Sequence, residues 1–244
     1  MSLLLEPYTL RQLTLLNRIA VSPMCQYSSV DGLANDWHLV HLGSRAVGGA
    51  GLVFTEATAV TADGRITAQD LGLWNDEQIE PLQRITRFIA AQGAVAGIQL
   101  AHAGRKASTY PPWLAKHGSV KIDEGGWLPV GPSPIAFDPQ HTQPKQLDEG
   151  EIADVIQAFV DSAKRALTAG FKVVEVHAAH GYLLHQFLSP LSNQRRDQYG
   201  GSFENRIRLV LQVTEAVRKV WPEELPLFVR VSATDCVEDG WNPD

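Results

Sequence analysis

Short apolar runs alternate along the chain with stretches in which apolar residues recur every three or four positions. The runs lack regular polar alternation, which predicts strands that are buried on both faces. The stretches between them predict amphipathic helices with one apolar stripe. Strands are expected at residues 18–23, 52–57, 95–101, 171–176 and 227–231. Helices are expected at residues 38–47, 75–93, 148–170 and 202–220.

This alternation of strands and helices predicts the α/β class, with a parallel sheet and helices packed outside it. A closed barrel and an open doubly wound sheet both fit the order of elements. An open nucleotide-binding sheet would normally carry a glycine-rich turn after its first strand. Residues 23–27 of this chain read PMCQY at that position. We therefore expect a TIM (β/α)8-barrel architecture in a single domain over residues 1–244.

Composition excludes several classes of function. The chain has 244 residues, of which 44% are hydrophobic, so it can bury a large core. Its net charge of −6 argues against nucleic acid and anionic membrane surfaces as partners. The first residues resemble no signal peptide, and no stretch is apolar enough to span a membrane. Two cysteines make no disulfide framework, and a cytoplasmic protein is expected.

A long segment at about residues 105–147 interrupts the alternation of elements. It is rich in Pro, Gly, Trp and His and has no clear periodicity. Such a segment within a compact domain is usually either functional or a sign that the elements have been assigned wrongly. We expect it to form a lid over the barrel mouth, held down by Trp113, Trp127, Val130 and Ile135.

Two imidazoles and a phenol follow the fourth apolar run closely. These are His177, His180 and Tyr182. Residues three apart in a regular strand face opposite ways, so both histidines reach one ligand only if the strand ends between them. The cluster is therefore expected at a strand's carboxyl end, where α/β proteins place their active sites. No third ligand with useful spacing lies nearby, so no metal site is expected.

Four motifs resemble those of the Old Yellow Enzyme family of flavin-dependent ene-reductases, in the family's order along the chain. They are SPMCQY at 22–27, QLAHAGRK at 99–106, HAAHGY at 177–182 and NQRRDQYGGSFENR at 193–206. The chain is most similar to the branch that includes xenobiotic reductases and thermophilic-like ene-reductases. The resemblance implies a barrel of the FMN-linked oxidoreductase type, with NADPH or NADH as reductant, a small α,β-unsaturated carbonyl compound as substrate, and a homo-oligomer.

The resemblance also implies an FMN site at the barrel mouth. Gln99 would bond the pyrimidine edge of the flavin. Arg230 would lie near N1 and O2, where a fixed cation favours the negative charge of the reduced ring. The other residues expected along the ring are Ser22, Pro23, Met24, Cys25 and Ala57. Cys25 matches a cysteine that tunes the redox behaviour of the flavin.

For catalysis, the resemblance implies that His177 and His180 clamp the carbonyl oxygen of the substrate. Hydride would pass from FMN N5 to the β-carbon, and Tyr182 would protonate the α-carbon. Tyr27 matches a second tyrosine that faces the substrate. For His102 and Lys106, loop solvation and substrate contact remain equally good interpretations.

The fifth predicted strand ends near Val231, and only 13 residues follow it. A closed barrel would need three more strand–helix units of roughly 30 residues or more each. The resemblance implies that those units hold the FMN phosphate. We therefore expect a barrel that is truncated after about its fifth strand, with the ring-binding and catalytic half present.

Two alternatives to the ene-reductase remain open. One is a multidomain relative such as a dienoyl-CoA reductase or amine dehydrogenase. The other is an inactive barrel fragment that acts as an assembly or interaction module. The residues at 25, 99, 177, 180, 182 and 230 argue against decay of the site, whereas the missing phosphate half argues for it.

Overall fold

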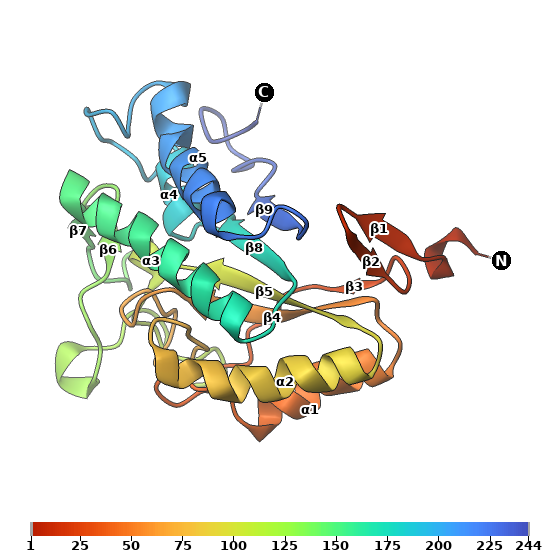
Figure 1. Ribbon diagram of the computed structural model, residues 1–244. Helices are drawn as coiled ribbons and strands as arrows, with labels where there is room; N and C mark the ends of the chain where they lie inside the picture. Colours follow the sequence, from red (N-terminus) through yellow and green to blue (C-terminus); the bar gives the residue numbers. More distant parts are fainter. Residues whose placement is uncertain (1, 244) are drawn as a thin grey trace.

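The computed structural model describes residues 2–243, and its centre is a five-stranded parallel sheet (Figure 1). The strands are β3 (Ala20–Val21), β4 (Leu52–Ala59), β5 (Val95–Ala101), β8 (Val173–Ala178) and β9 (Leu227–Val231). They lie side by side in the order β3-β4-β5-β8-β9, which is also their order along the chain. Each new strand is therefore added to the same edge of the growing sheet.

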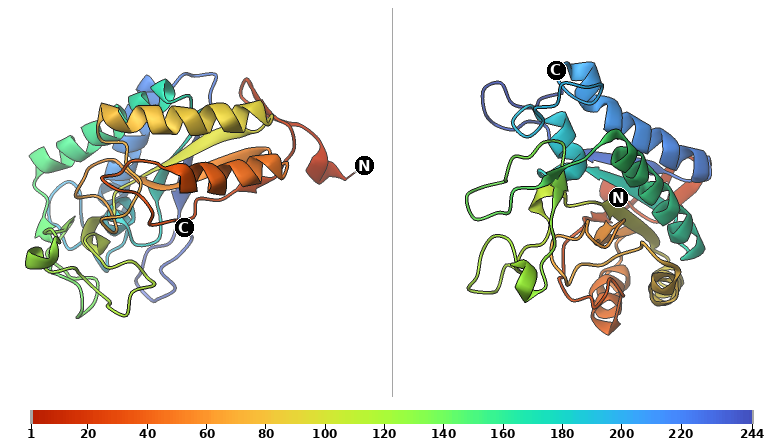
Figure 2. Two further views of the ribbon diagram at one scale, coloured as in Figure 1. Left: turned by 90° about the horizontal axis from the view of Figure 1, so that it is seen from below. Right: turned by 90° about the vertical axis from the view of Figure 1, so that its left-hand side faces the viewer.

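Long helices follow four of the strands and cover one face of the sheet. They are α1 (Asp36–Val47), α2 (Ile79–Ala91), α3 (Glu149–Thr168) and α5 (Phe203–Val220). Because crossovers between parallel strands are right-handed, an unreversed strand order places all the connecting helices on the same face. Figure 2 shows these helices as an arc around the strands. The sheet is thus part of a barrel, and the prediction of an α/β barrel architecture is confirmed.

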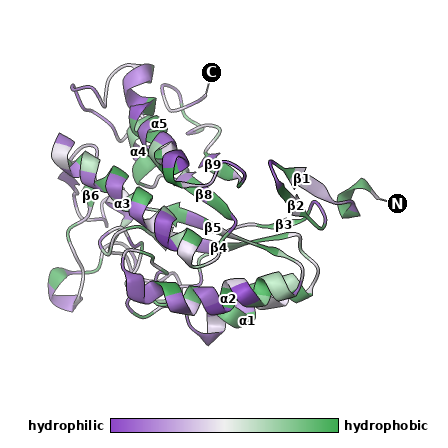
Figure 3. Ribbon diagram, in the orientation of Figure 1, coloured by the Kyte–Doolittle hydropathy of each residue, from purple (hydrophilic) through white to green (hydrophobic). Residues whose placement is uncertain are grey.

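Local sequence signals account for the helices. The Asp148 carboxylate accepts a hydrogen bond from the Glu151 amide (2.8 Å), and the Glu151 carboxylate accepts one from the Asp148 amide (3.0 Å). This reciprocal capping box begins α3 where the sequence predicts it. Gly170 adopts a left-handed conformation (φ 92°) just after the helix, as glycine does readily. Figure 3 shows the helices striped in hydrophilic and hydrophobic colours, as expected for elements with one buried face.

The two faces of the sheet differ in composition. Side chains alternate along each strand, so one set packs under the helices and the other faces the inside of the partial barrel. The helix-facing set includes Val53, Ile98, Leu100, Val174 and Val176. The inner set begins with a separate apolar cluster of Leu52, Phe54, Val173 and Phe228, joined by Leu15. This cluster fills the amino-terminal half of the inner face, and it leaves the carboxyl-terminal half for polar residues.

Several small elements were not predicted. A hairpin of β1 (Tyr8–Leu10) and β2 (Leu13–Leu15) brings Leu15 against the inner apolar cluster. The other missed elements are β6 (Val130–Gly131), which pairs with β7 (Lys145–Gln146), and α4 (Leu183–Leu188). Short 3-10 turns lie at Leu3–Leu5, Asp76–Gln78, Gly104–Lys106 and Ile122–Glu124. Elements of two to six residues are too short to show a recognisable period.

The boundaries of three predicted strands are corrected, and the second of these strands, expected at 52–57, extends to Ala59. The first strand, expected at 18–23, is only Ala20–Val21, because the Asn17 side chain binds the backbone amide of Ile19 instead (3.0 Å). The fourth strand, expected at 171–176, is Val173–Ala178, because the amide of Phe171 still bonds back to the end of α3. His177 is consequently inside the strand. Within residues 2–243, no helix is both long and apolar enough to cross a membrane.

Gly97 on β5 allows the inner apolar cluster to pack. A Cβ atom at this position would lie 2.7 Å from the Phe54 ring, whereas one at buried Gly131 would meet its nearest neighbour at 3.4 Å. We predict that Gly97→Ala lowers the free energy of unfolding by about 1–3 kcal/mol through overpacking, and that Gly131→Ala changes it far less. Urea denaturation measures both variants, and equal effects would contradict this account.

Candidate active site

A row of polar side chains occupies the inner face toward the carboxyl ends of the strands. Gln99 is paired in register with Glu175, and His177 is paired with Arg230. Residues paired across parallel strands point to the same face, so these four side chains lie together inside the partial barrel. The Gln99 amide donates a hydrogen bond to the Glu175 carboxylate (2.6 Å). A register shift after Phe54 places Ala57 opposite Gln99 and next to this row.

The three residues of the His/His/Tyr motif converge beside this row. The ring centroid of His177 is 5.0 Å from that of His180 and 5.2 Å from that of Tyr182. Strand β8 ends at Ala178, so the chain leaves the strand between the two histidines. His180 then takes a left-handed conformation (φ 60°), in a turn that leaves its ring beside that of His177. The structure therefore brings both imidazoles and the phenol to one point.

His177 is held in the neutral form. Its side chain is buried, and burial, followed by the positive charge of neighbours such as His180 and Arg230, lowers its pKa from 6.5 to about 3. Burial and the cations Arg230 and Lys106 also lower the pKa of His180. Among the residues that the structure describes, Nδ1 of His177 has no hydrogen-bond partner. A buried polar atom without a partner is uncommon, so this nitrogen is available to bind a ligand.

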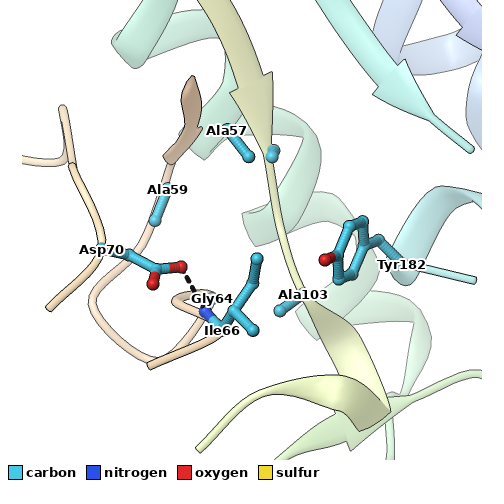
Figure 4. Close-up of a pocket in the computed structure, with 8 residues that line it drawn as sticks. Ala57, Ala59, Gly64, Ile66, Asp70, Ala103 and Tyr182 are labelled. Atoms are coloured by element: carbon cyan, nitrogen blue, oxygen red, sulfur yellow. Dashed lines mark hydrogen bonds between the residues drawn. The ribbon is translucent and has the colours of Figure 1, made fainter. Parts of the chain in front are cut away.

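Tyr182 lies next to a small cavity between the ends of β4 and β5. Figure 4 shows the Tyr182 ring on one side of this cavity and Asp70 on the other. Four alanines at positions 57, 59, 101 and 103 line it and keep it open. Burial raises the pKa of the Tyr182 hydroxyl, which therefore keeps its proton.

Sequence reasoning did not identify Asp70. Its carboxylate is buried and accepts hydrogen bonds from the backbone amides of Ile66 (2.6 Å) and Thr67 (3.1 Å). Burial outweighs these bonds and raises its pKa to about 7. Asp70 lies in a loop with no strand or helix period, so the sequence pattern gave no signal for it.

The loop after β3 approaches the same region. The Cys25 thiol is close enough to Ala57 and Tyr27 to bond with both, and burial raises its pKa to about 12, so it stays a thiol. Tyr27 is in a left-handed conformation (φ 48°), and its ring meets Trp113 edge-on with the centroids 5.6 Å apart. The preceding loop residues are Ser22, Pro23 and Met24, of which Ser22 and Met24 are exposed.

A buried pair that was not predicted fixes this loop. Glu56 on β4 accepts a hydrogen bond from the backbone amide of Gln26 (3.0 Å). Its other oxygen lies 3.1 Å from Nε2 of His38 on α1. Both side chains are nearly fully buried. The loop that carries Cys25 and Tyr27 is thereby tied to the sheet and to the first helix.

Residues 105–147 also reach the site. The Lys106 ammonium donates a hydrogen bond to the His180 carbonyl oxygen (3.0 Å) and lies 4.9 Å from the centre of the Tyr182 ring. Trp113, from the same segment, is the residue that meets Tyr27. His102, by contrast, is buried, and its Nδ1 accepts the Gly104 amide (3.0 Å), which is a structural role.

Comparison with known proteins shows to which protein family the chain belongs. Residues 3–242 match the NADH:flavin oxidoreductase / NADH oxidase family. The chain belongs to this family. The match covers all of the elements described above, so the polar row and the His/His/Tyr cluster lie within the family region.

Individual members of this family are similar to the chain in sequence and in fold. The chain is 54% identical to an NADH:flavin oxidoreductase from Gibberella zeae, over 95% of this chain and 57% of that protein. It is 46% identical to an NADPH dehydrogenase from Geobacillus sp., over 98% of this chain and 66% of that protein. The fold superimposes on Old Yellow Enzyme from Pichia sp. with a TM-score of 0.81 and 29% identity, over 95% of this chain and 60% of that one. The chain thus spans about three fifths of these relatives.

The buried imidazole of His177 predicts a specific loss of stability in acid. In the unfolded chain this residue protonates near pH 6.5, whereas in the folded protein its pKa is about 3. Its contribution to stability is therefore complete above pH 6.5 and is lost as the pH falls toward 3. We predict that His177→Gln reduces the slope of unfolding free energy against pH in this window, by at most about 1.4 kcal/mol per pH unit.

Chemical denaturation at a series of pH values measures that slope. The matched control is His117→Gln, because His117 is exposed on the long segment. The control should keep the slope of the unmodified protein. Identical slopes for the two variants would show that His177 does not remain neutral in the folded state.

Proposed function

We propose that this protein is an FMN-dependent ene-reductase, which transfers hydride from NADPH or NADH to the C=C bond of an α,β-unsaturated carbonyl compound. One observation carries the proposal. The buried His177 has an unpartnered ring nitrogen and lies beside His180 and a protonated Tyr182, on the inner face that also carries Gln99 and Arg230. These polar groups would destabilise a packed core, whereas a polarised carbonyl group and a flavin ring would provide hydrogen-bond and charge partners for them.

The residues present are suited to the ring of FMN. Gln99 offers an amide for the polar edge of the ring, and the alanine at position 57 leaves space next to it. The Arg230 guanidinium shares the inner face with His177, and its charge opposes the burial that raises the pKa of Glu175, so it would also attract a negatively charged ring edge. Ser22, Pro23, Met24 and Cys25 would lie along the ring from the loop after β3. When bound, FMN would supply hydride transfer between the nicotinamide and the alkene.

His177 and His180 would hold the substrate oxygen. A neutral imidazole has one N–H group, and two such groups aimed at one carbonyl oxygen would stabilise the negative charge that develops there. Burial, followed by the nearby cations Arg230 and Lys106, lowers both imidazole pKa values and so favours the neutral rings that this role requires. Withdrawal of electron density toward this oxygen would make the β-carbon electrophilic, so that it can accept hydride.

Tyr182 would complete the reaction as the proton donor. Its raised pKa keeps the phenol protonated until a stronger base, the developing carbanion at the α-carbon, takes the proton. Tyr27 would face the substrate from the opposite loop. Residues 105–147 would act as a lid, since Lys106 touches the His180 turn and Trp113 touches Tyr27.

Flavin binding tests this function directly. The purified protein should take up FMN, and its flavin absorption band should bleach with NADPH and recover when cyclohexenone is added. Size-exclusion chromatography with and without FMN is the second measurement, and the flavin should elute with the protein. A colourless protein with the same elution volume in the presence and absence of FMN would contradict the proposal and favour a cofactor-free assembly role.

Removal of the proton donor gives a sharper prediction. Tyr182→Phe should slow reduction of cyclohexenone by about 10²- to 10⁴-fold, because a positioned general acid contributes on this scale. Reduction of the flavin by NADPH should be unchanged, because that half-reaction needs no proton from Tyr182. Stopped-flow absorbance separates the two half-reactions.

The control for this variant is Tyr110→Phe. The Tyr110 hydroxyl binds Glu124 (2.6 Å) on the long segment and does not contact the His/His/Tyr cluster. Both half-reactions should proceed normally in the control. Equal rates of alkene reduction in Tyr182→Phe and Tyr110→Phe would remove Tyr182 from the mechanism.

A further inference from the structure

The turn that carries His180 is held in an unfavourable backbone conformation. His180 and Gly181 both have positive φ angles, 60° and 72°, and for a histidine this conformation persists only when its surroundings enforce it. The backbone amide of His180 donates to Oγ of Ser232 (3.0 Å). The backbone amide of Gly181 donates to Nδ1 of His185 (2.7 Å). The orientation of the His180 ring therefore depends on side chains outside the motif.

The bond from Gly181 determines the tautomer of His185. A backbone amide can only donate, so Nδ1 of His185 must be the unprotonated nitrogen. The proton is then on Nε2, which lies 3.0 Å from a carboxylate oxygen of Asp235. Asp235 thus stabilises the one tautomer of His185 that can accept the Gly181 amide.

Asp235 is itself held by hydrogen bonds that connect it, through Trp241 and Ser232, to the same turn. Its second oxygen accepts hydrogen bonds from the Ser189 hydroxyl (2.6 Å) and the Trp241 amide (2.7 Å). The Trp241 indole N–H donates to the carbonyl oxygen of Ser232 (2.8 Å), and Ser232 receives the His180 amide. The loop after β9 and the turn after β8 are therefore joined in one closed set of hydrogen bonds.

We propose that His185 and Asp235 are positioning residues that hold the His180–Gly181 turn, and with it the His180 imidazole, in the orientation needed to bind a substrate carbonyl oxygen. This inference rests on the proposed function for the identity of the ligand. The hydrogen-bonded arrangement of the turn stands without it. Sequence reasoning missed both residues, because His185 lies in the short helix α4, which was itself not predicted, and Asp235 lies in an irregular loop.

The arrangement is sensitive to acid. Protonation of His185 would put a hydrogen on Nδ1, opposite the Gly181 amide, and would replace a bond by a repulsion of two donors. Burial lowers the pKa of His185, so the neutral form prevails at neutral pH. The charged and titratable groups that face it are Asp235, which opposes this shift, and Lys106, Arg105, His177 and His180. The turn should hence loosen only as the pH falls below 6.5.

Three variants test the proposal, by two readouts. His185→Phe keeps a ring but removes both bonds, and His185→Gln keeps one acceptor and one donor that do not titrate. Asp235→Asn places an NH2 group opposite the Trp241 amide. The first readout is amide hydrogen exchange of residues 179–183 by mass spectrometry, which needs neither cofactor nor turnover. The second is the KM for cyclohexenone of the FMN-loaded protein, with its kcat.

His185→Phe and Asp235→Asn should speed exchange in this segment about tenfold and raise KM about tenfold, with a smaller change in kcat, since each change leaves at least one buried hydrogen-bonding group of the turn or its support without a partner. His185→Gln should stay within about threefold of the unmodified protein in both readouts. It should also keep its exchange protection as the pH is lowered below 6.5 until the unmodified protein begins to lose its own. The control is Asp239→Asn, an exposed residue of the same loop, which should change neither readout.

Unchanged exchange in His185→Phe would overturn the proposal, as would equal losses in His185→Phe and His185→Gln. Global unfolding of His185→Phe would appear as fast exchange in every segment. In that case the exchange of residues 179–183 in Asp235→Asn would decide whether the proposal holds. If the unmodified protein neither bound FMN nor reduced cyclohexenone, the proposed function would fail. The exchange measurements would still report on the turn.

Discussion

The pairing of β5, β8 and β9 in parallel register places Gln99, Glu175, His177 and Arg230 on one face of the sheet. Everything proposed for the site depends on this alignment. It requires that strands are added in chain order with the four long helices on the other face, which leaves the inner face free. It also requires the apolar cluster around Phe54 and Phe228, which fills the amino-terminal half of that face. The polar residues are consequently confined to the end where the loops meet.

The environment at the carboxyl ends of the strands favours the neutral form of the two histidines, although cations lie close to them. Burial lowers the pKa of His177 and of His180, and Arg230 and Lys106 act in the same direction. A site built in this way attracts negative charge through its cations and offers neutral N–H donors at the point of reaction. The His180 turn needs support from outside the motif, because its backbone conformation is unfavourable for a histidine.

Much of the fold could be predicted from the sequence. The runs 95–101 and 227–231 were predicted to the residue, and the capping box at Asp148 correctly marked the start of α3. Residues that depend on tertiary contacts could not be predicted. Glu56 and Asp235 bind Gln26 and His185, which are 30 and 50 residues away in the chain. Asp70 binds amides of its own loop, which has no strand or helix period to mark it. Only the folded structure shows which polar groups they meet.

The most direct test of the central claim is a crystal structure of the protein with FMN and an α,β-unsaturated ketone. The flavin ring should lie along Ala57, Gln99 and Arg230, with the ketone oxygen between the rings of His177 and His180 and the Tyr182 hydroxyl over the α-carbon. A ring bound elsewhere, or a ketone oxygen that contacts neither imidazole, would contradict the account.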